Sequence, residues 1–238
     1  MLITIAHQKG GVGKSTIAWL LYGELSKQIE DKKLKGYEKI YFIDFDIQKT
    51  ISKISEIRKN KHDEGINLLA VNTLQQFKNI YKKTALLKQQ KKDNSIIVVD
   101  LGGFDSEENR IIISASDIVI TPVSDKGFEL LGLKNFEQIL MSISKAKKSQ
   151  KKVKVVFNKI SHSKKDIKSV ESFVKKSKHF DLLQSVLKDR KVYDTIPTMG
   201  RFFHELTQQE LNNTSVLNGK KEIDNFTKEI IKEIRECL

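Results

Sequence analysis

A glycine-rich segment close to the amino terminus offers the most specific chemistry in this sequence. Between a short apolar run and a stretch with helical spacing, the chain reads Gln8-Lys9-Gly10-Gly11-Val12-Gly13-Lys14-Ser15-Thr16. Glycines allow backbone N–H groups to converge on phosphate oxygens, and the amino end of a helix adds a partial positive charge. In such a P-loop, Lys14 would bridge the β- and γ-phosphates and the Ser15 hydroxyl would bind Mg²⁺. The segment therefore predicts a site for ATP with Mg²⁺.

Carboxylates end two other apolar runs. Asp44 and Asp46 follow the run at 40–43, and Asp100 follows the run at 96–99. Ligands of parallel sheets bind at the edge where the strands end, so we expect these acids to lie beside the P-loop. Asp100 is then the Mg²⁺-binding acid of a Walker B strand. A pair of ordinary surface acids would give the same letters at 44 and 46, and that alternative stays open.

The charge of the chain is strongly uneven. The formal net charge is +13, and the segment from Lys145 to Lys191 holds 16 Lys and Arg residues against 4 Asp and Glu residues. Positive charge so concentrated predicts a polyanionic partner, either nucleic acid or an anionic membrane surface. A lysine-rich bias of the source genome would produce the same composition without any such partner.

Composition excludes several classes of protein. Cys237 is the only cysteine, so the chain contains no internal disulfide and no all-cysteine metal or iron–sulfur site. No run of about 18 apolar residues occurs, which argues against a membrane span. The amino terminus lacks the basic and apolar regions of a signal peptide and is predicted to form the first core strand. These features favour a globular protein of the cytoplasm.

Strand-like and helical segments alternate along the chain. The strand-like runs are apolar on both faces, which is typical of a parallel sheet covered by helices. We predict strands at 2–6, 40–44, 66–71, 95–100, 118–122, 153–158 and 192–196, and helices at 14–29, from 72 to about 92, and from 220 to the end. The expected fold class is α/β. It is a single P-loop NTPase domain over residues 1–238, with a mostly parallel sheet and helices on both faces.

The glycine-rich segment departs from the common P-loop pattern at its start. Gln8 replaces the first glycine, and an extra lysine, Lys9, precedes paired glycines. This form resembles the deviant Walker A motif of the ParA/MinD superfamily of P-loop ATPases, in which the extra lysine reaches the partner's nucleotide across a dimer interface. The resemblance implies an ATP-bound homodimer in which Lys9 and Lys14 are catalytic. It also implies a nucleotide-binding set of Lys9, Gly10, Gly11, Val12, Gly13, Lys14, Ser15, Thr16 and Asn158.

The acids after the second strand fit the same family. The stretch at 44–48 resembles its D-x-D-P-Q segment, with Ile47 in place of proline. By this resemblance Asp46 is the catalytic acid that positions the attacking water, while Asp44 supports Lys14 and the coordination of Mg²⁺. The expected metal-binding residues are Ser15, Asp44 and Asp100. Phosphoryl transfer depends on positioning and charge neutralisation, which suits a slow, switch-type, Mg²⁺-dependent ATP hydrolase.

Later segments extend the resemblance over nearly the whole chain. The paired glycines at 102 and 103 look like the family's switch II, and 116–123 resembles its A-D-x-V-x-x-P-V strand. Asn158 stands where the family reads adenine, although a simple turn residue would look the same. An I-P-x-x-x-R segment runs from Ile196 to Arg201. The helix after switch II is expected to be capped by Asp105, Ser106 and Asn109.

Composition also separates the branches of the superfamily. The single cysteine excludes the nitrogenase iron-protein branch, the single P-loop argues against arsenical pumps, and the sequence lacks the terminal tyrosine cluster of related bacterial kinases. ParA-type partition ATPases fit best. Their ATP dimer binds duplex DNA non-specifically, and a ParB-like partner stimulates hydrolysis and releases the dimer. Gln48 and the basic segment favour this branch, and no helix-turn-helix region precedes the P-loop, as in its short members.

Non-specific DNA binding is largely phosphate neutralisation, so scattered basic side chains suffice. The candidate DNA contacts are Lys188, Arg190, Lys191 and Arg201, with Lys151, Lys152, Lys220 and Lys221 as further candidates. Each of them could equally be a solvated charge. The expected role is DNA segregation by a nucleoid-associated protein of the cytoplasm.

Two alternatives stay open. A MinD-like ATPase that positions cargo or division machinery at a membrane surface would use the amphipathic C-terminal helix. The apolar stripe of that helix is equally typical of a helix packed on its own domain, and no aromatic cluster ends it, so membrane binding is the less favoured reading. The other alternative is a metabolic ATPase of the same fold. The sequence identifies neither the cargo nor the partner protein.

Overall fold

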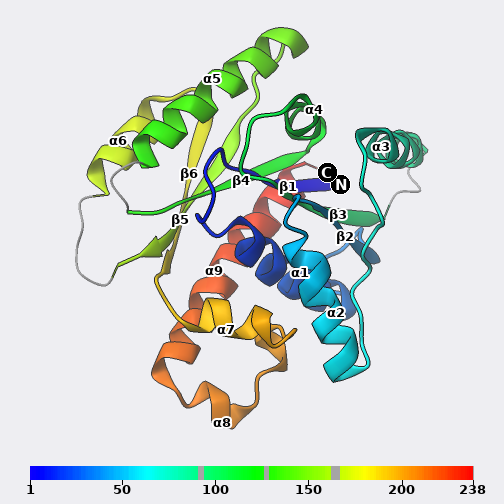
Figure 1. Ribbon diagram of the computed structural model, residues 1–238, viewed down its shortest axis with the longest axis vertical. Helices are drawn as coiled ribbons and strands as arrows, with labels where there is room; N and C mark the ends of the chain where they lie inside the picture. Colours follow the sequence, from blue (N-terminus) through cyan, green and yellow to red (C-terminus); the bar gives the residue numbers. More distant parts are fainter. Residues whose placement is uncertain (91–93, 126–128, 162–166, 238) are drawn as a thin grey trace.

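Six parallel strands form the centre of the molecule (Figure 1). The computed structural model describes residues 1–90, 94–125, 129–161 and 167–237. The strands are β1 (Leu2–Ile5), β2 (Lys39–Phe45), β3 (Ser95–Leu101), β4 (Ile118–Val123), β5 (Val153–Ile160) and β6 (Phe180–Lys188). They lie in the order β2-β3-β1-β4-β5-β6, and all five pairings between neighbours are parallel. The parallel α/β fold expected from the alternating pattern is confirmed.

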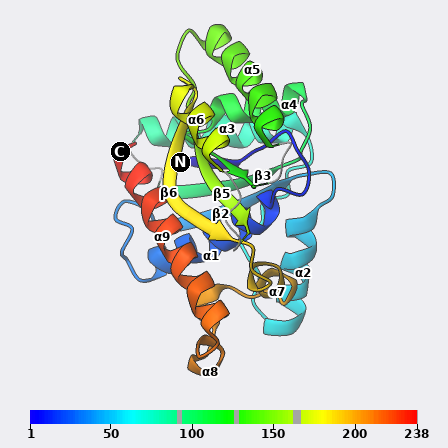
Figure 2. The same ribbon diagram turned by 90° about the vertical axis from the view of Figure 1, so that its left-hand side faces the viewer.

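Helices cover both faces of this sheet (Figures 1 and 2). One face carries α1 (Lys14–Glu30) and α9 (Thr214–Glu236), and the other carries α3 (Leu74–Gln89), α4 (Glu107–Ala115), α5 (Glu129–Lys147) and α6 (Lys168–Lys176). Successive side chains of β3 point to opposite faces of the sheet. Ile96 and Val98 pack in the core under α1 and α9, and Ile97 and Val99 pack in the core on the other face. Burial on both faces explains why the strands are continuous apolar runs.

A group of short helices lies together in the lower part of Figure 1. It comprises α2 (Thr50–His62), α7 (Val192–Thr198), the 3₁₀ turn η1 (Phe203–Glu205) and α8 (Gln208–Leu211). The ring of Phe202 stacks on Trp19 of α1, with 4.8 Å between the ring centroids, and the guanidinium of Arg58 lies 4.4 Å above it. Arg58, which is buried in α2, also pairs with Glu205 at 2.6 Å. These contacts fix the short helices against α1.

Strand order determines where a ligand can bind. The connection from β1 leads to β2 on one side of it, whereas the connection from β3 leads to β4 on its other side. Ligands of parallel sheets bind at such a reversal of strand order. The P-loop leaves the carboxyl end of β1. In the strand register, Asp100 lies opposite Ile5 on one side and Asp44 on the other. The register therefore brings the two predicted acids to the P-loop edge.

Two of the predicted strands are not strands in the structure. Residues 192–196 form the start of α7, where Tyr193 and Ile196 are both buried at the spacing of one helical face. Residues 66–71 run beside β2 but make a single isolated bridge, between Leu68 and Phe42. In both places β-branched residues favour a strand locally, but packing against the rest of the protein outweighs this preference.

One strand was not expected, and one helix begins earlier than expected. β6 alternates buried residues with exposed or half-buried ones, such as Gln184, so it lacks the apolar run used to find the others. The last helix begins at Thr214 rather than at 220, because the side chain of Asn213 caps it by accepting from the N–H of Ser215 at 2.9 Å. Across the described residues, no helix combines the length and apolar character needed to cross a membrane.

Candidate nucleotide-binding site

The P-loop joins β1 to α1 and packs so closely that glycine is required within it. Gly13 adopts a φ of 93° in the left-handed region, directly before α1 begins. A Cβ at this position would lie 2.3 Å from Nδ2 of Asn158. That same Nδ2 donates a hydrogen bond to the carbonyl of Val12 at 2.7 Å. The loop is thus held against the carboxyl end of β5, and the amino end of α1 is available to an anion.

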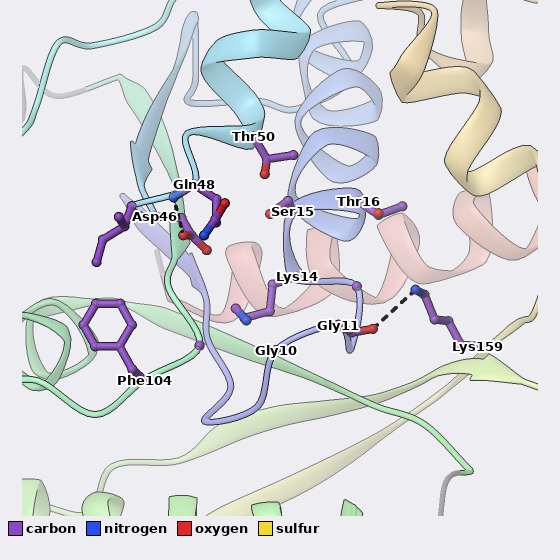
Figure 3. A pocket seen from close by; sticks show the side chains of 13 residues that line it. Gly10, Gly11, Lys14, Ser15, Thr16, Asp46, Gln48, Thr50, Phe104 and Lys159 are labelled. Atoms are coloured by element: carbon purple, nitrogen blue, oxygen red, sulfur yellow. Dashed lines mark hydrogen bonds between the residues drawn. The ribbon is translucent and has the colours of Figure 1, made fainter.

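A cavity of about 470 Å³ opens beside the P-loop (Figure 3). Its walls come from the P-loop, from the segments that follow β2 and β3, and from the end of β5. The residues that line it include Gly10, Gly11, Gly13, Lys14, Ser15, Thr16, Asp46, Ile47, Gln48, Thr50, Gly103, Phe104 and Lys159. Such a volume is within the range of small-molecule sites. The sequence therefore located this pocket correctly at the ends of several strands.

Lys14 brings the central positive charge to this pocket. Its side chain is buried, and its Nζ donates to the carbonyl of Lys9 at 3.2 Å. Burial lowers the pKa of Lys14, and the neighbouring carboxylates of Asp100 and Asp46 oppose that shift. A buried ammonium group beside an open cavity is suited to charge-assisted hydrogen bonds with phosphate oxygens.

Asp100 is the strongest indication of a cation at this site. The residue is fully buried, and neither of its carboxylate oxygens has a hydrogen-bond partner of normal geometry among the described residues. Burial raises the pKa of Asp100 to about 7, while the nearby Ser15 hydroxyl opposes the shift. An unpartnered buried carboxylate next to a hydroxyl supplies the hard oxygen ligands that Mg²⁺ prefers. Ser15 and Asp100 therefore fit a magnesium ion that takes its remaining ligands from water and phosphate.

Asp44 and Asp46 have different surroundings although they are two residues apart. Asp44 is buried, and its Oδ2 accepts from the backbone N–H and the hydroxyl of Ser52, both at 2.8 Å. Asp46 lines the pocket, and its Oδ1 accepts from the N–H of Gln48 at 2.9 Å. Asp44 thus anchors the first turn of α2, and its support of the Mg²⁺ coordination stays a prediction. Asp46 faces the space in which a phosphate would bind.

Lys9 has a partner that the sequence did not reveal. Its Nζ lies 2.7 Å from Oε1 of Glu129, a buried residue at the start of α5. The backbone N–H of Lys9 donates to Nδ1 of His7 at 2.9 Å. Burial lowers the pKa of His7 to about 4, so the ring is neutral near pH 7 and can accept through Nδ1. In this conformation Lys9 is directed toward its own α5.

The switch II segment approaches the P-loop closely at one glycine. A Cβ on Gly103 would lie 2.9 Å from Nζ of Lys14 and 3.1 Å from the backbone N of Gly10. The next residue, Phe104, lines the pocket and is 42% exposed. The close approach explains why a glycine follows the Walker B strand here. It also means that a phosphate bound at the P-loop would contact this segment.

The capping prediction for α4 is confirmed at one of its three residues. Ser106 is the N-cap, and its hydroxyl accepts from the N–H of Asn109 at 3.1 Å. Asn109 instead supports the switch segment, since its Nδ2 donates to the carbonyl of Phe104 at 2.8 Å. The expectation for Asp105 is wrong, because its carboxylate pairs with Arg110 at 2.5 Å.

The end of β5 supplies one residue that was predicted and one that was missed. Asn158 is buried against the P-loop rather than lining the cavity, so its contact with adenine remains a prediction. The next residue, Lys159, has a φ of 55° and donates from Nζ to the carbonyl of Gly11 at 3.3 Å (Figure 3). A strand register shift between Phe157 and Ile160 accompanies this turn. No sequence pattern indicates the left-handed conformation that directs Lys159 toward the pocket.

The candidate DNA contacts fall into two groups. Two arginines are already ion-paired, Arg190 with Glu222 at 2.7 Å and Arg201 with Glu210 at 2.6 Å. Lys191 is exposed and Lys188 is half-buried. Among the further candidates, Lys151 donates to the carbonyl of Ser116, Lys152 pairs with Asp181 at 3.2 Å, Lys220 pairs with Asp224 at 2.8 Å, and Lys221 is exposed. The paired side chains have an evident role in the fold.

Comparisons with known proteins agree with this geometry. A family model described as the CobQ/CobB/MinD/ParA nucleotide binding domain matches residues 3–200. Protein ParA of Rhizobium radiobacter is 24% identical over 245 residues, which covers 100% of this chain and 99% of that protein. A plasmid partition protein of Borrelia burgdorferi bound to AMPPNP is similar with a TM-score of 0.60 and 20% identity, over 96% of this chain and 98% of that one. The MinD cell division protein of Aquifex aeolicus gives a TM-score of 0.62 and 18% identity, over 97% and 96%.

The sheet order, the P-loop and the pocket define a nucleotide-binding domain of the P-loop class. Because the family model covers most of its length, the chain belongs to the CobQ/CobB/MinD/ParA nucleotide-binding family. The resemblance to the ParA/MinD superfamily seen in the deviant Walker A motif is thereby confirmed.

Proposed function

We propose that this protein is a ParA-like partition ATPase, which binds and hydrolyses ATP with Mg²⁺ in the P-loop pocket. Its ATP-bound homodimer binds duplex DNA without regard to sequence, and a ParB-like partner stimulates hydrolysis and releases the dimer. The cycle drives segregation of a DNA cargo in the nucleoid region of the cytoplasm. The observation that carries the ATPase assignment is the convergence of Lys14 and Asp46 on one cavity, with the carboxylate of Asp100 buried near Lys14.

The chemistry of this site is electrostatic. Backbone N–H groups of the P-loop and the ammonium group of Lys14 bind and neutralise the β- and γ-phosphates. Ser15 and Asp100 would hold Mg²⁺, which supplies further neutralisation of phosphate charge. Asp46 accepts a hydrogen bond from the attacking water and orients it toward the γ-phosphate. The hydrogen bond from the N–H of Gln48 to Oδ1 holds the Asp46 carboxylate in one orientation.

Lys9 completes the site only in a dimer. Family resemblance assigns it to the nucleotide of the partner protomer, and its present contact with Glu129 keeps it on its own chain. To act across the interface, Lys9 must exchange the Glu129 carboxylate for a phosphate of the partner's ATP. The exchange replaces one charge-assisted contact by another, so its cost is small enough for ATP binding to drive it.

Two observations favour DNA over a membrane as the surface that the dimer binds. The curated relative that spans the whole chain is a ParA protein, and the net positive charge concentrates between residues 145 and 191. The MinD-like alternative needs a free apolar stripe on the last helix. In α9 that stripe is part of the core, with Ile223, Phe226, Ile230 and Ile234 fully buried.

Binding to random-sequence duplex DNA tests the proposed cycle. Fluorescence anisotropy would be recorded with no nucleotide, with ADP and with ATP–Mg²⁺, each across a series of salt concentrations. We expect binding that is much stronger with ATP than without it, weakens steeply with salt and ignores sequence. Absence of DNA binding in all three states would contradict the partition role. Pelleting with anionic vesicles in the ATP state would then favour the membrane alternative.

A further inference from the structure

Two lysine-rich segments meet at the edge of the sheet opposite the nucleotide pocket. The first, residues 144–152, covers the end of α5 and the turn that leads into β5. The second, residues 174–180, covers the end of α6 and the turn that leads into β6. Together they contain eight lysines and no acidic residue. Helices α5 and α6 lie side by side on one face of the sheet (Figures 1 and 2).

Hydrogen bonds hold these segments together. The N–H of Val153 donates to the carbonyl of His179 at 2.9 Å, and a second bond of 2.9 Å joins Nδ1 of His179 to the carbonyl of Lys151. The side chain of Gln150 donates to the carbonyl of Lys178. The lysines are thus presented by a defined surface rather than by two independent loops.

Five of the eight lysines form what we call the amino-edge patch. They are exposed and have no ion pair or hydrogen bond through the side chain among the residues that the structure describes: Lys145, Lys148, Lys175, Lys176 and Lys178. The other three have partners, since Lys147 and Lys151 donate to backbone carbonyls and Lys152 pairs with Asp181. Of the acids around the second segment, Asp181 pairs with Lys152 and Glu137 accepts a hydrogen bond from the hydroxyl of Ser177. The positive charge of the patch is therefore not neutralised by ion pairs among the described residues.

We propose that the amino-edge patch is the surface through which this protein binds the phosphate backbone of duplex DNA. The inference rests on the proposed function and says which face performs it. Lysine ammonium groups on flexible stems suit phosphate neutralisation, which needs charge but little fixed geometry. The ion-paired Arg190 and Arg201 are less suited, because DNA would have to displace Glu222 and Glu210.

Duplex DNA fits this patch better than a membrane surface does. Membrane-bound helices place large apolar side chains beside their basic residues. Neither lysine-rich segment contains an exposed large apolar side chain. On α5 such residues are Leu131, which lies far from the patch, and Met141, which lies one helical turn before Lys145. A patch with several lysines and a single neighbouring exposed methionine offers little apolar surface to a membrane, and it suits a ligand bound through phosphates.

The position of the patch has a consequence for control by nucleotide. The pocket lies at the carboxyl edge of the sheet, whereas the ends of α5 and α6 lie at the amino edge. Bound ATP cannot touch the DNA surface, so nucleotide must act through dimerisation, which joins two patches in one particle and raises affinity by multivalency. A monomer should accordingly retain weak, salt-sensitive binding whatever nucleotide is present.

Charge removal at matched positions tests this assignment. One variant changes the five patch lysines to glutamine: Lys145→Gln, Lys148→Gln, Lys175→Gln, Lys176→Gln and Lys178→Gln. The control removes the same charge from exposed lysines of α2 and α3: Lys53→Gln, Lys59→Gln, Lys61→Gln, Lys82→Gln and Lys83→Gln. Binding to random-sequence duplex DNA is measured with a non-hydrolysable ATP analogue and Mg²⁺ across a salt series. Thermal unfolding and ATP turnover confirm that both variants are folded.

We expect the patch variant to bind DNA at least tenfold more weakly, with a log–log salt slope smaller by about four, while the control stays close to the wild type. An unchanged slope in the patch variant, or an equal loss in the control, would overturn the assignment and leave the proposed function standing. If the wild type binds no DNA with the analogue, the proposed function itself fails. If the wild type binds anionic vesicles but not DNA, and the patch variant loses vesicle binding, the patch would instead be a membrane-binding surface.

Discussion

Lys9 and Lys14 lie on one loop, but their side chains differ in burial and point to different parts of the protein. Lys14 is buried at the centre of the pocket, whereas Lys9 points to α5 and is 37% exposed at its side chain. Glu129 is almost fully buried, and it lies 2.7 Å from Nζ of Lys9 but 3.9 Å from Nε2 of His7. Removal of that carboxylate would leave Lys9 without its intramolecular partner. The contact is therefore a restraint on the lysine that the proposed dimer would use.

Glu129→Gln should make the ATP-bound dimer form more readily. The amide keeps the shape of the side chain but loses the charge that holds Lys9, so we expect dimerisation at a severalfold lower protein concentration. Sedimentation velocity with a non-hydrolysable ATP analogue measures this directly. Lys9→Ala is the matched control and should not dimerise. Dimerisation of Glu129→Gln at the wild-type concentration would show that the ion pair does not restrain Lys9.

Gly103→Ala should damage the site without a large effect on the fold. The new Cβ would meet Lys14 and the backbone of the P-loop, and such overpacking costs about 1–3 kcal/mol. We expect weaker ATP binding by calorimetry and slower turnover. Gly65→Ala is the control, because a Cβ there meets nothing within 4 Å and should leave both quantities unchanged. Normal ATP binding by Gly103→Ala would mean that the switch segment is not confined by the P-loop.

Residues whose role is set by nearby sequence were predictable, and residues set by distant contacts were not. The P-loop and Asp100 could be located because each stands at the end of an apolar strand. Glu129 could not, because it is 120 residues from Lys9 and meets it only after the sheet has formed. Lys159 was missed because a lysine with a positive φ has no sequence signature.

At the scale of elements, one carboxylate joins the end of β6 and α7 to α9. Glu222 on α9 accepts from the N–H of Lys188 at 2.9 Å, the guanidinium of Arg190 at 2.7 Å and the hydroxyl of Tyr193 at 2.6 Å. Burial raises the pKa of Glu222, but these hydrogen bonds outweigh it and leave the pKa below its ordinary value of 4.5. Arg190 thus has a structural role in this network.

Glu222→Gln should lower the free energy of unfolding by about 1–3 kcal/mol at pH 7, because hydrogen bonds to a charged group are replaced by weaker ones. Since the folded pKa is depressed, the stabilisation is present above pH 4.5 and is lost as the pH falls through the folded value. Urea denaturation at pH 7 and pH 4 should therefore show a flatter pH dependence in the variant. Exposed Glu56→Gln is the control. A loss equal to that of Glu56→Gln would contradict the network.

Element prediction succeeded where a segment is buried on both sides and failed at the periphery. The strands β1 to β5 are covered by helices on both faces, and their continuous apolar runs are unambiguous. β6 is the last strand of the sheet and includes exposed Gln184, so its pattern is weaker. α7 shares β-branched residues with strands, and only its packing against α1 and α9 makes it helical.

At the scale of the whole molecule, α9 is a structural layer. Its buried side chains join those of α1 and the sheet in one core, which fills the space behind the P-loop helix. A helix that must leave this core to bind a membrane would expose several fully buried residues at once. The packing therefore argues against the MinD-like use of the C-terminal helix.

Phe226→Ala measures how firmly α9 is held. The ring is fully buried in the core, and truncation of such a side chain costs about 3–5 kcal/mol. Urea denaturation should show this loss, while Lys228→Ala on the exposed side of the same helix should change stability by less than about 0.5 kcal/mol. A loss below about 1 kcal/mol for Phe226→Ala would mean that the helix is loosely held and free to bind elsewhere.

ATP turnover by Asp46→Ala, measured together with ATP binding, tests the central claim most directly. Lys14→Ala serves as the binding control and should lose affinity for ATP. In the proposed mechanism Asp46 orients the water and does not hold the phosphates, so we expect Asp46→Ala to bind ATP with nearly wild-type affinity. Its turnover should fall by about 100-fold or more. Hydrolysis at the wild-type rate by Asp46→Ala would contradict the assignment of this carboxylate as the catalytic acid of the pocket.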